Sequence, residues 1–205
     1  MQRYENKINN AFTAKTIISD FDRQSLPFDA KEIRVIPNGV DPEHYKPQEI
    51  EKEFDVLFTG NMNYQPNIDA AITIIEQIYP ILKNTIPDIK IGIAGNTNNK
   101  QILNAKNKNI IIVPDVKDMR AMYARTKVYI APMFTGAGLQ NKLLEAMSMG
   151  IPCVATEITN LSLKGKPNDE IIVTQNANTL AQAALKLLAD SKKQKELGEK
   201  GQAFI

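Results

Sequence analysis

The feature that most limits the fold of this chain is an alternation, from residue 55 onward, between short β-rich runs and segments with helical periodicity. Most of the runs are apolar without a strict apolar and polar alternation, which is typical of strands that are covered on both faces. The runs are residues 55–59, 89–95, 109–114, 127–132, 152–156 and 170–174.

The intervening segments have the signals of amphipathic helices. Apolar residues recur at helical spacing across residues 66–84, where Pro66 suits the first turn, and Asp118 and Asn178 are placed to cap two later helices. This alternation predicts an α/β fold with a doubly wound, mostly parallel, Rossmann-like sheet and right-handed crossovers. Ligands of such sheets bind beyond the carboxyl ends of the strands, so we expect the chemistry in the loops that follow them.

The first forty residues have a different character. The opening "MQRYENKINNAF" is charged and helical, "AKTIISD" is typical of a strand, and "KEIRVIPNGVDPEHYKP" has the turn and proline content of a linker. A lone helix and strand cannot bury a core of their own. We therefore expect residues 1–40 to be the end of a truncated N-terminal domain with the interdomain linker, and residues 41–205 to be the ligand-binding domain.

The composition excludes several classes of function. A formal net charge of +2 gives no reason to expect a nucleic-acid partner. The chain has neither an apolar run of about 20 residues nor the apolar segment of a signal peptide, so we expect a cytoplasmic protein. Peripheral association with the inner face of the membrane stays open. Cys153 in "IPCVAT" is expected to be a buried structural thiol, and His44 lies in no metal-binding pattern, so we expect neither a metal nor a cofactor.

The first β-rich run ends in the glycine loop "FTGNMNYQPN". Gly60 allows close approach of the backbone, and the amides that follow it are placed to face an anion near the next helix. A tight turn between a strand and a helix also needs glycine for conformational reasons alone. The loop by itself therefore leaves an anion site and a structural turn equally open.

The fourth run ends in a richer loop, "APMFTGAGLQNKLLEAMSMG". Gly136 and Gly138 are placed to expose backbone amides, and a helix from about Leu139 would present its positive end to the same point. Lys142 adds a mobile charge, so these residues together describe a diphosphate cradle. Glu145, in the next turn, is placed to accept hydrogen bonds from a ribose diol. The alternative is an ordinary exposed helix glutamate, or one paired with Lys142.

Five segments of the chain, taken in order, closely resemble the C-terminal half of the family 4 retaining glycosyltransferases, which have the two-domain GT-B fold. The resemblance extends over nearly all of residues 33–190. The segments are "VIPNGVDPEHYKP", "VLFTGNMNYQPNIDA", "IKIGIAG", "IIIVPDVKDMRAMYARTKVYIAP" and "GAGLQNKLLEAMSMGIPCVAT".

The resemblance implies that this domain binds a nucleotide-sugar donor of the UDP, GDP or ADP type, while an N-terminal domain supplies most of the acceptor site. It places Gly60 and Asn61 against the diphosphate and the backbone of Asp115 and Val116 beside the base. It implies metal-free sugar transfer with retention of configuration, and we expect a cell-envelope or polysaccharide acceptor. Backbone amides and basic side chains would stabilise the leaving diphosphate.

The family pattern also assigns roles in the second loop, where this chain departs from it. Gly138 and Leu139 would offer amides to the phosphate or sugar, and Glu145 would hold the ribose diol. Family members often have a first glutamate before the second, but eight positions before Glu145 this chain has Ala137. They also commonly have a basic residue just after the first strand, and Lys142 is the candidate replacement. We expect Glu145 and Lys142 to be the catalytic residues.

Two other functions fit the same residues. One is half of a nucleotide-sugar 2-epimerase of the same fold, which would need acid and base groups spread over two domains. The other is a noncatalytic nucleotide-binding domain in which the glycine loops are only turns. Family members generally continue past "GEKGQAFI" into a helix that returns to the N-terminal domain. We therefore expect these 205 residues alone to bind the donor at most, without transferring sugar.

Overall fold

The computed structural model describes residues 12–26, 28–135 and 141–205. The charged N-terminal segment predicted to be helical and the loop residues Gly136, Ala137, Gly138 and Leu139 lie outside the described residues.

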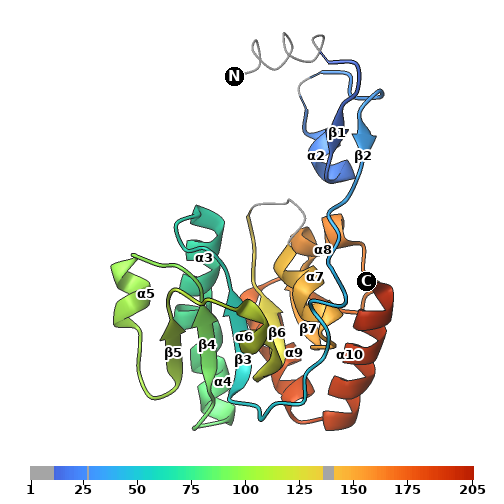
Figure 1. Cartoon of the computed structure of the whole chain (residues 1–205). Coiled ribbons are helices and arrows are strands. Elements are labelled where there is room, and N and C mark those ends of the chain that lie inside the picture. Colours follow the sequence, from blue (N-terminus) through green and yellow to red (C-terminus); the bar gives the residue numbers. More distant parts are fainter. Residues whose placement is uncertain (1–11, 27, 136–140) are drawn as a thin grey trace.

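A six-stranded sheet organises most of the chain, and every neighbouring pair of its strands is parallel. The strand order is β5-β4-β3-β6-β7-β8, which confirms the predicted doubly wound fold (Figure 1). Each predicted run overlaps one of these strands. Their bounds are Phe54–Thr59 for β3, Ile91–Ala94 for β4, Ile110–Val113 for β5, Thr126–Ala131 for β6, Cys153–Thr156 for β7 and Ile172–Thr174 for β8.

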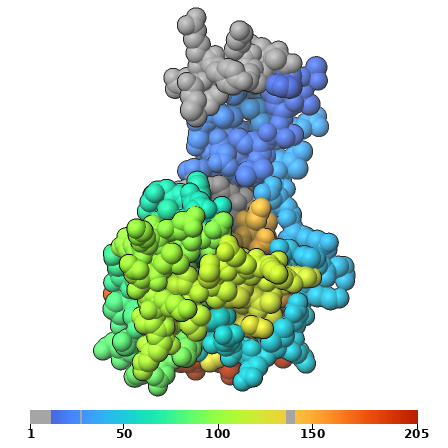
Figure 2. All heavy atoms as spheres, turned by 60° about the vertical axis from the view of Figure 1, so that its left-hand side comes forward, coloured from blue at the N-terminus to red at the C-terminus, as the bar shows by residue number. Residues whose placement is uncertain are grey.

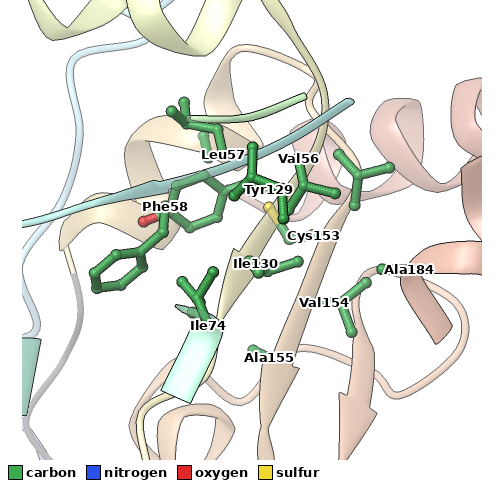
Figure 3. Close-up of a cluster of buried hydrophobic side chains, with 14 of the residues drawn as sticks. Val56, Leu57, Phe58, Ile74, Tyr129, Ile130, Cys153, Val154, Ala155 and Ala184 are labelled. Carbon is green, nitrogen blue, oxygen red and sulfur yellow. The ribbon is translucent and has the colours of Figure 1, made fainter. Parts of the chain in front are cut away.

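The centre of the sheet is buried on both faces. In β3, the consecutive residues Val56, Leu57 and Phe58 have no exposed surface, so side chains that point to opposite faces are equally covered. This explains why the strands lack an alternating pattern. Figure 3 shows that Ile74 and Ala184, from two different helices, lie near the strand residues Ile130 and Val154.

Helices that follow β3 and β4 lie on one face of the sheet. The segments α3 (Gln65–Thr73), the π-helix η1 (Ile74–Ile78) and α4 (Tyr79–Thr85) form one continuous run, with Pro66 in its first turn as predicted. Helix α5 spans Lys100–Asn104. Helix α9 (Ala177–Leu188) packs against η1 and α4 and so shares this face.

The predicted cap of α9 is wrong by two residues. Asn176, and not Asn178, has the extended backbone of an N-cap, and its side chain accepts a hydrogen bond from the amide of Thr179. Thr179 Oγ1 in turn accepts from the amide of Asn176, which completes a capping box. Asn178 falls inside the first turn, where its side chain cannot reach the amides that need a partner.

Right-handed crossovers place the helices that connect β5 to β8 on the opposite face. These helices are α6 (Met119–Ala124), α7 (Asn141–Ser148) and α8 (Glu157–Leu163). The last helix, α10 (Ser191–Phe204), packs against α7 and α9. Asp118 caps α6 as predicted, by accepting a hydrogen bond from the amide of Arg120. The winding reverses between the adjacent strands β3 and β6, so the loops that follow them meet at a topological switch point.

A small unit precedes the sheet and stands above the larger one (Figures 1 and 2). It contains β1 (Thr16–Ile17), α2 (Asp20–Gln24) and β2 (Arg34–Val35), and β1 lies in the predicted strand run. The second strand, β2, lies in a segment that the sequence predicted to be linker. The prediction missed it because a strand of two residues forms here only by pairing with β1, which is distant in the sequence. Its assignment to a preceding domain stays a prediction. In the described part of the chain, no helix has the length and apolar character of a membrane span.

Candidate functional site

A pocket of about 560 Å³ opens beside the carboxyl ends of the strands, next to the switch point between β3 and β6. It brings together all the predicted site residues that the structure describes. Gly136, Gly138 and Leu139, also predicted, lie outside the described residues. The described residues that line the pocket are Tyr45, Thr59, Gly60, Asn61, Gly95, Asn96, Asp115, Val116, Lys117, Met119, Tyr123, Lys142 and Glu145.

Two loops packed backbone to backbone form one wall of the pocket. The amide of Gly60 donates to the carbonyl of Ala94 at 3.0 Å, and the amide of Met62 donates to that of Asn96 at 2.8 Å. A Cβ on Gly95 would lie 2.1 Å from the carbonyl oxygen of Gly60, and the φ of Gly95 is +123°. Any side chain at position 95 would therefore separate the loops that follow β3 and β4.

Gly60 makes room for a side chain and not for backbone. A Cβ on Gly60 would lie 2.9 Å from Cγ of Asn67, and Gly60 is not among the described glycines with positive φ. Asn67 is buried against it and donates from Nδ2 to the carbonyl oxygen of Asn61 at 2.9 Å. This bond leaves the other end of the Asn67 amide, Oδ1, facing Lys142 of α7. The absence of a side chain at position 60 thus lets α3 approach the pocket wall.

Lys142 reaches across the edge of the sheet from α7 to α3. Its Nζ donates to Oδ1 of Asn67 at 2.5 Å and lies 4.9 Å from the centroid of the Phe58 ring. Burial lowers the pKa of Lys142 to about 8, and the charge of Glu145 acts in the opposite direction. Among the described residues, no carboxylate forms an ion pair with this ammonium. The simple Lys142–Glu145 pair considered from the sequence is therefore not formed, and the buried charge is suited to an external anion.

Glu145 is held at the pocket and is not an ordinary exposed helix glutamate. Its Oε2 accepts a hydrogen bond of 2.7 Å from the hydroxyl of Tyr123, and its side chain is only partly exposed. Tyr45 approaches from the segment that connects the two units, and burial together with the nearby charge of Glu145 raises the pKa of Tyr45. The carboxylate on α7 therefore lies between α6 and the connecting segment.

The far side of the pocket is formed by the loop that follows β5. Asp115 has a φ of +53°, a left-handed conformation that aspartate tolerates better than most residues, and it turns the chain before Val116. At the rim, Arg120 forms an ion pair of 2.7 Å with Asp118, and its Nη1 lies 3.4 Å from Nδ1 of His44. Hydrogen bonding to Arg120 lowers the pKa of Asp118. This side carries the exposed charged residues Asp115 and Lys117 besides the apolar Val116 and Met119.

Several pocket residues were missed from the sequence. Gly95 and Asn96 follow the second strand of the pattern, so the same argument that selected Gly60 would have found them. Tyr45 and Tyr123 have no such signal, because only tertiary packing brings them to Glu145. Cys153, in contrast, is buried as predicted, and burial raises the pKa of its thiol.

Comparison with known proteins links this geometry to one family. The family model for glycosyl transferases group 1 matches residues 53–190. A protein of Klebsiella pneumoniae described as an uncharacterized 44.6 kDa protein in the cps region is 26% identical over 160 residues, which cover 74% of this chain and 41% of that protein.

Solved glycosyltransferase structures share the fold. TarM of S. aureus, in a complex that contains UDP, has a TM-score of 0.82 at 18% identity over 96% of this chain and 41% of that chain. HepE of Anabaena, in complex with UDP and glucose, has a TM-score of 0.81 at 15% identity over 98% of this chain and 61% of that chain. This chain therefore has the Rossmann-like architecture of one half of a GT-B protein, and spans between 41% and 61% of the length of these relatives.

Proposed function

This chain belongs to the glycosyl transferases of group 1, the family that its motifs predicted, and we propose that it binds the nucleotide-sugar donor of a retaining sugar transfer. The observation that carries this proposal is the placement of Lys142 and Glu145. They lie three residues apart on α7 and face one pocket at the switch point of a doubly wound sheet. A partly buried ammonium and a fixed carboxylate, this close together, match the diphosphate and the ribose of a nucleotide.

The proposed binding mode follows the walls of the pocket. The diphosphate lies between Lys142 and the loop of Gly60 and Asn61, where the ammonium has no described carboxylate partner. The base lies against the backbone of Asp115 and Val116 on the far side. Relatives of the same fold contain UDP, or UDP and glucose, which supports a ligand of this class. UDP, GDP and ADP all stay candidates for this chain.

The proposed chemistry depends on charge at the leaving group. When the bond between the sugar and the diphosphate breaks, negative charge grows on the diphosphate oxygens, and the ammonium of Lys142 stabilises it without a metal. Glu145 holds the ribose and so fixes the position of the diphosphate relative to Lys142. Both side chains are thereby assigned direct contact with the donor, which is what the sequence predicted.

The proposed acceptor is a polysaccharide or a cell-envelope component. A polysaccharide or cell-envelope acceptor is suggested by the relative from a cps region. Since the chain spans 41% of that relative and 61% or less of the two solved structures, complete sugar transfer is proposed for it only together with an acceptor-binding domain. A cytoplasmic location, and membrane contact through that domain, also stay predictions.

A binding screen tests the donor assignment. Titration calorimetry with UDP, GDP, ADP and their sugar conjugates is expected to find one nucleotide that binds clearly better than the others. Glu145→Gln should weaken that binding, while Lys186→Met, which replaces an exposed lysine on α9, should leave it unchanged. If no nucleoside diphosphate or nucleotide sugar binds, the proposal is wrong and a noncatalytic domain becomes the better interpretation.

A further inference from the structure

We propose that Tyr123 is a positioning residue of the donor site, whose hydroxyl fixes the carboxylate of Glu145 for recognition of the ribose hydroxyls. The inference rests on the proposed function, because it assigns to Tyr123 a role in ribose recognition by Glu145. It adds a residue that acts through Glu145, and a buried chain of hydroxyls that holds this residue in place.

The hydroxyl chain runs from the centre of the sheet to the pocket. The hydroxyl of Tyr129 lies 3.0 Å from Oγ1 of Thr59, which lies 3.1 Å from the hydroxyl of Tyr123. The hydroxyl of Tyr123 then donates to Oε2 of Glu145 at 2.7 Å. The four residues come from β6, β3, α6 and α7, so the chain joins both central strands to two helices of one face.

The ionised carboxylate gives this chain a single direction. A carboxylate only accepts, so the one proton of the Tyr123 hydroxyl is used on Glu145. Tyr123 must then accept from Thr59, and Thr59, having used its own proton, must accept from Tyr129. Three hydroxyl dipoles therefore align toward one negative charge, and hydrogen bonds aligned in this way strengthen each other.

Burial restricts the movement of the hydroxyl chain. Tyr123 and Tyr129 have no exposed surface and Thr59 is 2% exposed, so water does not compete for their hydroxyls. The Tyr123 ring also packs edge to face against Tyr129 and Tyr45, with centroid separations of 5.7 and 6.5 Å. The carbonyl oxygen of Tyr45 accepts a hydrogen bond from Ser148 at 2.8 Å, which fixes the connecting segment to α7. The Tyr123 hydroxyl therefore has one position, and Glu145 takes its orientation from it.

Removal of this hydroxyl should affect ribose recognition more than overall binding. Without the Tyr123 hydroxyl, the carboxylate of Glu145 keeps only its interaction with the Tyr45 side chain, and the nearby positive charge of Lys142 favours a turn away from its original position. A nucleotide that lacks one ribose hydroxyl makes less use of Glu145 and should therefore be less sensitive to the change. The preference for the ribonucleotide over its 2′-deoxy counterpart is thus the quantity that reports on the role of Tyr123.

The test compares Tyr123→Phe with Tyr129→Phe. Both changes remove one buried hydroxyl from the same chain, but only Tyr123 touches Glu145. Calorimetry uses whichever of UDP, GDP and ADP binds the wild type, with its 2′-deoxy form. Tyr123→Phe is expected to reduce the ribonucleotide preference by roughly tenfold, as for loss of a hydrogen bond to a charged group. It should weaken 2′-deoxynucleotide binding much less, and Tyr129→Phe should keep most of the preference.

The remaining outcomes separate the two proposals. The role of Tyr123 is overturned if a folded Tyr123→Phe variant keeps the wild-type preference for the ribonucleotide. It is also overturned if Tyr123→Phe and Tyr129→Phe lose this preference equally. Both results leave donor binding intact. Donor binding without any ribose preference overturns the role of Glu145 as well. No nucleotide binding by the wild type overturns both proposals. If thermal unfolding shows that Tyr123→Phe does not fold, Thr59→Val is tested in its place, because it removes the hydroxyl that donates to Tyr123. This variant should also reduce the preference for the ribonucleotide. An unchanged preference in Thr59→Val contradicts the inference.

Discussion

Replacement of Lys142 by methionine should separate the stability of this domain from its ability to bind a nucleotide. Methionine keeps most of the length of the partly buried side chain and removes the charge. In the folded protein burial lowers the pKa of Lys142 from an ordinary value of 10.5 to about 8. At about 1.36 kcal/mol per unit of pKa, this difference corresponds to a free-energy cost of about 3 kcal/mol for the buried ammonium at neutral pH.

Part of this cost is offset by the hydrogen bond to Asn67. Without Lys142, Oδ1 of Asn67 loses its partner at a buried position, which costs about 1–3 kcal/mol. The variant is therefore expected to be more stable than the wild type at pH 7 by about 1 kcal/mol, while its affinity for the nucleoside diphosphate falls tenfold or more. A lysine that lowers the stability of the domain but raises its affinity for an anion is typical of a charged binding site.

The pH dependence gives the sharper measurement. Below pH 8 the folded and unfolded states both carry the ammonium, and the wild type bears the full cost of burying it. Between pH 8 and 10.5 the folded state loses this proton first, so wild-type stability rises relative to the variant. Urea unfolding at pH 7 and pH 10 should show the difference between the two proteins shift by about 2–3 kcal/mol in favour of the wild type.

An exposed lysine provides the control for this measurement. Lys186→Met on α9 should show no comparable shift, because an exposed ammonium pays little for its place in the folded protein. A stability difference between Lys142→Met and the wild type that stays constant from pH 7 to pH 10 would refute the argument that burial depresses this pKa. Unchanged nucleotide affinity in a folded Lys142→Met variant would remove Lys142 from the donor site.

Three further predictions test other parts of the structure. Nucleotide affinity should fall as pH rises above about 8, because Lys142, with a pKa of about 8, then loses the proton that carries its charge. Calorimetry near pH 8 in buffers of different ionisation enthalpy should detect proton uptake on binding. Gly95→Ala should destabilise the domain by several kcal/mol in urea unfolding, since its Cβ would lie 2.1 Å from a backbone oxygen. Gly39→Ala is the control, because a Cβ at position 39 would have no atom within 4 Å, and it should be nearly neutral. Asn176→Ala should cost about 1 kcal/mol through the lost cap and Asn178→Ala much less; equal effects would contradict the observed capping box.

The parallel sheet could be predicted because its signals are local. Each buried strand is a short apolar run, and the glycines, prolines and caps between the runs occur within a few residues of the boundary that they set. The family resemblance, carried by the order of five such segments, is confirmed by the family match over residues 53–190. The two-residue strand β2 was missed because its pairing with β1 joins Thr16 to Arg34, a contact that no local pattern encodes.

The site could be predicted only where it follows the strand ends. Gly60, Asp115 and Val116 occur directly after strands and could be placed at one edge of the sheet. The partners of Lys142 and Glu145 could not be placed, because Asn67 approaches from the opposite face and Tyr123 reaches the pocket through packing in α6. The sequence thus indicated which side chains carry charge, and the structure adds what holds each charge in position.

The loop after β3 has no basic side chain, and the structure suggests how the charge is supplied instead. Asn67 is anchored on the backbone of that loop by its bond to Asn61, and its free oxygen receives the ammonium of Lys142 at 2.5 Å. The cation therefore reaches the first glycine loop from the other wall of the pocket. If the diphosphate binds as proposed, its positive partner is then supplied by α7 through an asparagine bridge. In this arrangement Gly60 is needed to make room for Asn67, so the glycine and the distant lysine serve one site.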